Sequence, residues 1–164
     1  MSLYVPSHFQ ARDRTAFARL AHDHPFATLV TPGVAEPLVT HLPLIHVPDR
    51  EPNGTLLGHF ARANPHSRAA AGMESMAIFH GPHAYVSPSW YADPAGAVPT
   101  WNYAVAHAHG TIELAQDGAE TRAIVDLLIQ LHAADLLQAD ITPDAAALFE
   151  RYKKRRDQTW KQWL

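Results

Sequence analysis

Residues 38–61 read LVTHLPLIHVPDREPNGTLLGHFA and contain two strand-like runs joined by a short polar segment. The first run, Leu38 to Val47, alternates between two faces, and the second run is Thr55 to Ala61. Asn53-Gly54 lies between them, and an Asn-Gly pair in this position is the strongest short-range signal for a β-hairpin. Pro43 interrupts the first run. Because proline cannot donate to a ladder, we expect an edge strand or a bulge there.

Further strand-like runs lie on both sides of this hairpin. They cover Phe26 to Thr31, Met76 to His80, Tyr85 to Ser87 and Tyr103 to Leu114, with Gly81-Pro82 breaking the middle pair. Consecutive hairpin-like strands predict an antiparallel sheet, and about six short strands favour a closed barrel or a sandwich. The predicted class is therefore α+β.

Helical patterns flank and interrupt the strands. Asp13 caps a short helix to His22, and Asn64-Pro65 begins another that Gly72 ends. From Ala119 an amphipathic pattern predicts one helix, and Thr142-Pro143 begins a last helix over residues 144–164. We expect a single domain over 1–164, with the sheet at about 3–114 and two C-terminal helices at about 119–164.

Composition excludes several classes of protein. The 164 residues include no Cys, which removes thiol nucleophiles, CxxC redox chemistry and Cys-ligated metals. The formal net charge is −3, so a chain-wide basic field for nucleic acid is absent. No run approaches a membrane span and the first residues do not resemble a secretory signal. We expect a cytoplasmic protein.

The junction from His59 to Pro65 is the most informative candidate site. A strand runs into a helix start there, where free N–H groups favour an anion, and Arg62 can pair with a phosphate. The hairpin brings Thr40 and His41 alongside. The alternative is a capped surface helix with a solvated Arg62.

Two aromatic segments form a second candidate. Residues 79–91 and 98–103 interleave aromatic side chains with Pro, Ser and Thr. Such a wall suits a flat heteroaromatic ligand. The alternative places Trp90, Trp101 and Tyr103 in the core or in a dimer interface.

Other chemistries have weaker signals. Histidine pairs such as His107 and His109 lack the third ligand of a known zinc signature, so we expect no metal site. GxSxG, Walker-type and GxGxxG motifs do not occur. The run Lys153, Lys154, Arg155, Arg156 is a candidate DNA contact, although most such runs are solvated.

Several long motifs in the same order resemble the PaiB family over about residues 3–114. They are YVPSHF at 4–9, PFATLV at 25–30, THLPL at 40–44, GHFARANP at 58–65, AIFHGPHAYVSPSWY at 77–91 and VPTWNY at 98–103. The resemblance implies an FMN-binding split barrel related to the pyridoxamine-phosphate-oxidase-like proteins. It also implies a homodimer with two flavin sites at the subunit interface, and a role as a negative transcriptional regulator.

The resemblance also implies which residues would hold FMN. The phosphate side would be Thr40, His41, His59, Ala61, Arg62 and Asn64. The ring side would be Thr28, Leu42 and Pro43 from one subunit, with Trp101, Asn102 and Tyr103 from the other.

Three functions stay open at this point. The first is a PaiB-type flavin protein acting as a regulator, and the second is an oxidoreductase that uses FMN with a nicotinamide donor. The third is a barrel without flavin that acts as a protein-interaction module. No residue is compelled to be a catalytic acid or base.

Overall fold

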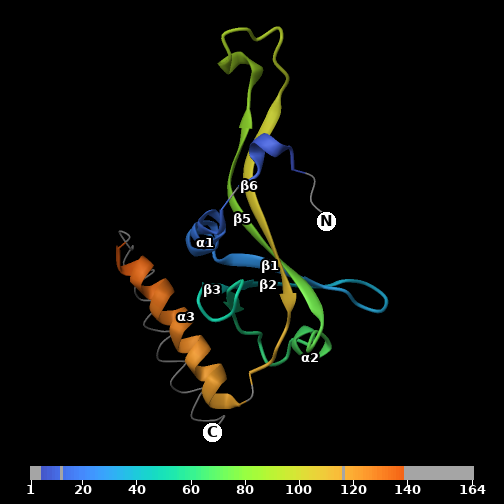
Figure 1. Cartoon of the computed structure of the whole chain (residues 1–164), viewed down its shortest axis with the longest axis vertical. Helices are drawn as coiled ribbons and strands as arrows, with labels where there is room; N and C mark the ends of the chain where they lie inside the picture. Colours follow the sequence, from blue (N-terminus) through green and yellow to red (C-terminus); the bar gives the residue numbers. More distant parts are fainter. Residues whose placement is uncertain (1–4, 12, 116, 139–164) are drawn as a thin grey trace. The chain divides into compact units, whose positions relative to one another are not determined.

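A computed structural model describes residues 5–11, 13–115 and 117–138 of the chain. The chain divides into two compact units, residues 1–125 and 126–164, and the strands of the described ranges all lie in the first (Figure 1). The helices are α1 (Arg14–Asp23), α2 (His66–Ala69) and α3 (Gly118–Gln138), with 3-10 turns at Ser7–Phe9 and Pro88–Trp90. The strands are β1 (Phe26–Thr31), β2 (Leu38–Pro43), β3 (Ile45–Val47), β4 (Thr55–Leu57), β5 (Glu74–Val86) and β6 (Thr100–Thr111).

All strand pairs among the described residues are antiparallel, which confirms the predicted mixed class with antiparallel sheets. Four strands form one sheet in the order β2-β1-β5-β6, and β3 pairs with β4 in a second sheet. Closure of these strands into a split barrel stays a prediction. The expected last helix and the basic run at 153–156 lie outside the described residues.

The predicted hairpin at Asn53-Gly54 is confirmed. Ile45 pairs with Leu57 in β3 and β4, and Gly54 has a φ of +82°, a conformation that glycine adopts without strain. The long first run divides after Pro43, where the chain leaves the four-stranded sheet. Because β2 is the edge strand of that sheet, Pro43 needs no ladder partner for its missing N–H.

The core lies on one face of the four-stranded sheet. Alternate residues of β1 and β5 are buried there, with Ala27 opposite Phe79 and Leu29 opposite Ala77. Phe17 of α1 meets Phe79 edge-on at 5.6 Å between ring centroids. Helix α1 begins as predicted, since the Oδ1 atom of Asp13 accepts the backbone N–H of Ala16 at 2.8 Å.

One strand prediction is wrong. Gly81-Pro82 does not separate two strands; β5 runs through it, and the register with β6 shifts between His80 and His83. The irregularity leaves Pro82 outside the regular pairing, so the missing N–H does not end the strand. Strand β6 correspondingly begins at Thr100, earlier than the expected Tyr103.

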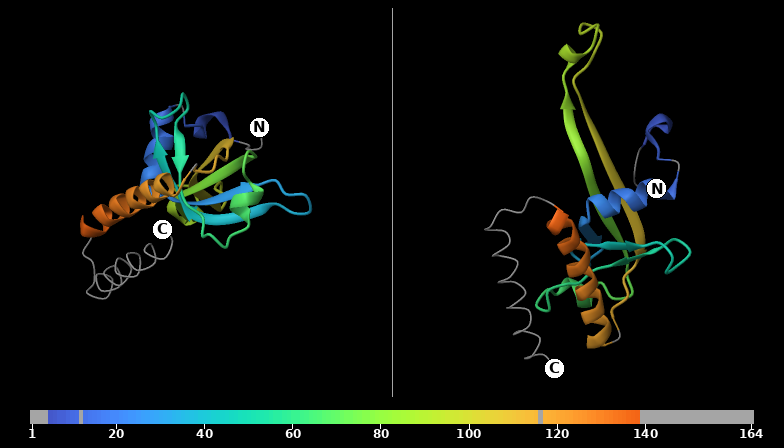
Figure 2. Two further views of the ribbon diagram at one scale, coloured as in Figure 1. Left: turned by 90° about the horizontal axis from the view of Figure 1, so that it is seen from below. Right: turned by 90° about the vertical axis from the view of Figure 1, so that its left-hand side faces the viewer.

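The outer half of the β5–β6 hairpin, residues 83–103, projects beyond the rest of the sheet, and we name it the arm (Figures 1 and 2). Strand β1 pairs with β5 only between Met76 and Phe79, so within the described sheet the arm strands pair only with each other. The arm carries large exposed side chains: Tyr85, Trp90, Tyr91, Val98, Trp101 and Tyr103.

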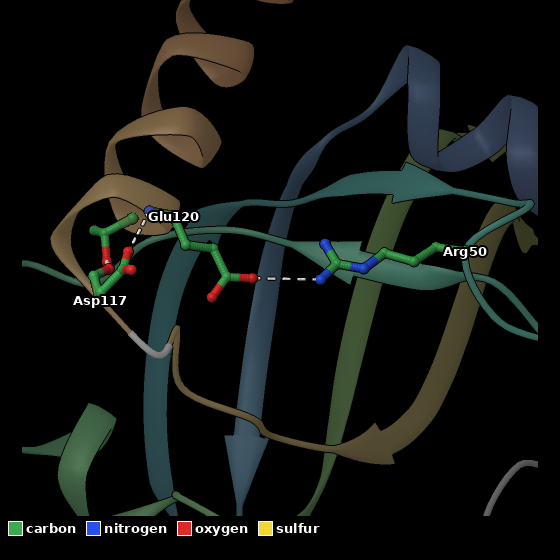
Figure 3. A network of polar contacts seen from close by, with 4 residues as sticks. Arg50, Asp117 and Glu120 are labelled. Carbon is green, nitrogen blue, oxygen red and sulfur yellow. Dashed lines mark hydrogen bonds and ion pairs between the residues drawn. The ribbon is translucent and has the colours of Figure 1, made fainter.

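Polar contacts fix the start of α3 (Figure 3). The Oδ1 atom of Asp117 accepts the backbone N–H of Glu120 at 2.8 Å, and the Glu120 carboxylate lies 3.4 Å from Arg50 Nη2. Arg50 belongs to the segment between β3 and β4, so this ion pair joins the small sheet to the helix start. No helix in the described ranges is long and apolar enough to cross a membrane.

Candidate functional site

A surface pocket of about 470 Å³ lies at the start of α2. Its lining residues are Arg62, Ala63, Asn64, Pro65, Arg68 and Ala69. Two guanidinium groups and one carboxamide in one pocket favour an anionic ligand, and arginine can pair with a phosphate through two hydrogen bonds. Arg62 and Asn64 are predicted site residues.

Sequence reasoning missed Arg68. The signal was present, since Arg68 lies six residues after Arg62 on the predicted helix, but a surface arginine on a helix is ordinary by itself. Only the fold shows that the two side chains line the same pocket.

The loop before α2 has a defined geometry. The backbone N–H of Asn64 donates to the carbonyl of Ala61 at 2.8 Å, and Asn64 Oδ1 accepts the backbone N–H of His66 at 3.0 Å. Asn64 therefore accepts an N–H of the first turn as predicted, but the helix begins one residue later than expected, with Pro65 at the N-cap position and His66 as the first helical residue. Helix α2, however, spans four residues, so its dipole is small and the arginines supply most of the positive charge.

Behind the pocket lies a chain of polar contacts that we name the His66 network: Asn64, Thr40, His66, Thr31 and Ser75. Asn64 Nδ2 donates to Thr40 Oγ1 at 3.1 Å, and Thr40 Oγ1 lies 2.8 Å from His66 Nδ1. On the other side of the ring, His66 Nε2 lies 2.9 Å from Thr31 Oγ1, which lies 2.6 Å from Ser75 Oγ.

The inner part of this network is deeply buried. His66 is 3% exposed, Thr31 0% and Ser75 7%. Burial lowers the pKa of His66 below its usual value, because removal from water disfavours the charged imidazolium. His66, Thr31 and Ser75 were not among the predicted site residues.

His59 is half-buried beside Phe60 in the segment that leads to the pocket. Its Nδ1 atom is buried and has no hydrogen-bond partner among the described residues. Burial also lowers the pKa of His59. A buried ring nitrogen without a partner is uncommon in folded proteins and is a candidate contact for a ligand.

The structure separates two neighbours that the resemblance places on one side of the ligand. Thr40 contacts Asn64 and His66, whereas the Nδ1 atom of His41 lies 3.0 Å from Thr28 Oγ1. Successive residues of a strand point to opposite faces, so Thr40 and His41 lie on different faces of β2. Leu42 is 5% exposed and belongs to the core.

The predicted ring-side residues of the arm are exposed. Trp101 and Tyr103 are 52% and 65% exposed, and Asn102 lies between them on β6. The Trp101 ring stacks on His83 at 5.6 Å.

The arm and the pocket lie at opposite ends of the β5–β6 ladder. Gly72, just after α2, donates its N–H to the carbonyl of Ile112 at 2.8 Å, which places α2 beside the end of β6. Eight residue steps separate Tyr103 from Thr111, a distance of about 26 Å along a strand. Trp101 to Tyr103 therefore lie far from the pocket of their own chain.

A family model described as "Putative FMN-binding domain" matches residues 3–158. The chain belongs to this FMN-binding domain family. The resemblance to the PaiB family is also confirmed. The protease synthase and sporulation protein PAI 2 of Bacillus subtilis (strain 168) is 30% identical over 157 residues, 94% of this chain and 64% of that protein.

Two further proteins are similar to this chain. An uncharacterized protein of Saccharomyces cerevisiae is 23% identical over 137 residues, which are 70% of this chain and 80% of the yeast protein. The solved structure of an FAD and heme binding protein from Mycobacterium smegmatis shares the fold, with a TM-score of 0.57 and 21% identity. That match covers 84% of this chain and 63% of the mycobacterial chain.

Proposed function

We propose that this chain binds FMN, with the phosphate in the pocket lined by Arg62, Asn64 and Arg68. The observation that carries the proposal is the pair of arginines in one pocket of a chain that belongs to an FMN-binding domain family. The terminal phosphate of FMN is a dianion, and two guanidinium groups match its charge and its oxygen geometry.

The residues around the pocket fit such a ligand. Asn64 lines the pocket and its Nδ2 atom donates to Thr40 Oγ1 at 3.1 Å. The Nδ1 atom of His59, which has no partner among the described residues, would be a further contact from the same segment. Of the other phosphate-side residues that the resemblance implies, Ala61 belongs to the segment before the pocket, whereas His41 faces Thr28 on the opposite face of β2 from Thr40. When bound, FMN supplies one- and two-electron transfer, while the protein supplies orientation and electrostatics.

We further propose that the ring of FMN lies between two copies of this chain, in a homodimer of split barrels. Thr28, Leu42 and Pro43 would come from one copy, Leu42 through its backbone because its side chain is buried. Trp101, Asn102 and Tyr103 would come from the arm of the other copy. The support is that the arm exposes its aromatic residues at the opposite end of the β5–β6 ladder from the pocket, with about 26 Å of strand between Tyr103 and Thr111.

An absorption spectrum between 300 and 550 nm, taken after FMN addition and desalting, tests the proposal. We expect flavin bands that stay with the protein and disappear in the double variant Arg62→Ala, Arg68→Ala. A wild-type protein that stays colourless would overturn it and leave a flavin-free interaction module. Bleaching of bound flavin by NADH or NADPH would support the oxidoreductase alternative.

A role as a negative transcriptional regulator is a second proposal. It is supported by the family resemblance and by the basic run Lys153, Lys154, Arg155, Arg156 in the sequence. It predicts binding to promoter fragments that weakens steeply with salt and is lost when the four cations are replaced by alanine. A mobility shift that survives their loss contradicts it.

A further inference from the structure

The His66 network has a defined order of donors because a neutral imidazole carries one N–H and one lone pair. Both ring nitrogens of His66 face hydroxyl oxygens, Thr40 Oγ1 at 2.8 Å and Thr31 Oγ1 at 2.9 Å. Fixing the ring proton on one nitrogen therefore sets which way each hydroxyl points. The amide of Asn64 is already fixed, because its oxygen accepts the N–H of His66.

With the proton on Nε2, the ring hydrogen and all three hydroxyl hydrogens of the network have acceptors inside the protein. Nε2–H donates to Thr31, Thr31 donates to Ser75, and Ser75 donates to the carbonyl of Met73 at 3.4 Å. The Thr40 hydroxyl donates to Nδ1 and accepts from Asn64. This arrangement needs no ligand.

With the proton on Nδ1, one hydrogen is left over at the pocket end. Nδ1–H and Asn64 Nδ2–H then both donate to Thr40 Oγ1, while Thr31 donates to Nε2 and Ser75 donates to Thr31. The Thr40 hydroxyl proton then has no acceptor among the contacts of the described residues. It needs an acceptor from outside, beside the Asn64 side chain that lines the pocket.

We propose that His66 is a positioning residue of the phosphate pocket, and that a bound phosphate converts its imidazole from the Nε2–H to the Nδ1–H tautomer. The phosphate would accept a hydrogen bond from the Thr40 hydroxyl and so make the Nδ1–H arrangement the more stable one. The network holds the same number of protons in both arrangements. One proton leaves Nε2 to water and one arrives at Nδ1 from water, and the three hydroxyls turn to match.

This inference deepens the proposed FMN site and rests on it for the identity of the ligand. The chain of contacts from the pocket to Ser75, on which the inference also depends, is present in the structure without any cofactor. The conversion would carry the state of the pocket to Ser75 at the start of β5, through His66 and Thr31, which are almost fully buried.

The test is nitrogen-15 NMR of the histidine side chains in the whole chain, free and with FMN or inorganic phosphate. The His66 signals are identified by their absence from the His66→Asn spectrum. We expect a protonated Nε2 in the free protein and a protonated Nδ1 with ligand. FMN binding without a change of tautomer overturns this inference and leaves the proposed function intact.

Inorganic phosphate separates the two proposals in the other direction. A tautomer change with phosphate in a protein that does not retain FMN supports the inference and contradicts the proposed cofactor. No change with either ligand overturns the inference.

A matched pair of variants gives a second readout. The amide of His66→Asn approximates the Nδ1 position and keeps a donor for Thr40, whereas that of His66→Gln approximates Nε2 and keeps only the Thr31 side. We expect His66→Gln to weaken FMN or phosphate binding by about tenfold more than His66→Asn, the value of one hydrogen bond.

His22→Ala, at an exposed position of α1 outside the network, is the control. It should leave both stability and affinity close to those of the wild-type protein. Equal affinities for His66→Asn and His66→Gln would show that the histidine is merely structural.

Discussion

The Nδ1 atom of His66 lies 2.8 Å from the hydroxyl oxygen of Thr40, and His66 is only 3% exposed. Replacing His66 by alanine would remove a hydrogen-bond partner from the hydroxyls of Thr40 and Thr31 and would leave a cavity. We expect His66→Ala to lower the free energy of unfolding by about 2–4 kcal/mol. Urea denaturation measures this, with His22→Ala on the exposed face of α1 as the control. A loss no larger than that of the control would contradict the structural role of the network.

Stability should also depend on pH, through the three histidines whose pKa burial lowers: His46, His59 and His66. Their folded pKa values lie below the unfolded value of 6.5, so between these values the unfolded chain binds more protons. The stabilisation is complete above pH 6.5 and is lost as pH falls through the folded pKa values.

Urea midpoints at several pH values between 5 and 8 test this dependence. We expect the free energy of unfolding to fall on acidification below about pH 6.5. The slope should be shallower in His66→Gln. A stability that rises on acidification would show that these rings are charged in the folded protein.

The pocket arginines should contribute to the affinity for FMN. We expect Arg62→Ala to weaken FMN binding by about 1.5–3 kcal/mol, the usual contribution of a charge-assisted hydrogen bond. Arg68→Ala should act in the same direction. Fluorescence titration of FMN measures the effect, and Arg19→Ala on α1 is the matched control. An unchanged affinity for FMN in both variants would contradict the assignment of the phosphate to this pocket.

A site shared between two copies predicts complementation. Arg62→Ala and Trp101→Ala should each lose flavin alone, but a dimer containing one chain of each kind has one intact site. After equal amounts are mixed and allowed to exchange, about a quarter of all sites should bind FMN again. If hybrid dimers form but no FMN binding returns, Arg62 of one copy and Trp101 of the other copy do not form a shared site.

Two glycines with positive φ should respond differently to the same substitution. Gly54→Ala costs about 1–2 kcal/mol of backbone strain, and its Cβ would collide with the imidazole of His46. Gly72 has a φ of +74° and nothing within 4 Å of the added atom. We expect Gly54→Ala to be the more destabilising by about 1 kcal/mol in urea denaturation. Equal losses would show that the β3–β4 turn moves freely away from His46.

Local patterns predicted the parts of the fold that depend on neighbouring residues. The Asn53-Gly54 turn, the Asp13 cap and the break at Pro43 each follow from the chemistry of a few adjacent residues. The strand through Gly81-Pro82 could not be predicted in this way. Its continuity comes from β6, about twenty residues away, which pairs on both sides of the irregularity.

The candidate site divides along the same line. Arg62 and Asn64 were predictable because capping and charge are local to one segment. The His66 network joins side chains from β1, β2, α2 and β5, and it exists only when the registers of those strands place Thr31, Thr40 and Ser75 around one ring. Twelve histidines in the sequence gave no reason to prefer His66.

The inner and outer halves of β5 and β6 are under different structural constraints. In the inner half of β5, Ala77 and Phe79 are buried in the core, so substitutions there lower the free energy of unfolding. In the outer half, Tyr85, Trp101 and Tyr103 can change with little cost to the rest of the sheet, because within the described sheet the arm strands pair only with each other. Evolution can therefore alter what the arm recognises while the scaffold below it stays the same.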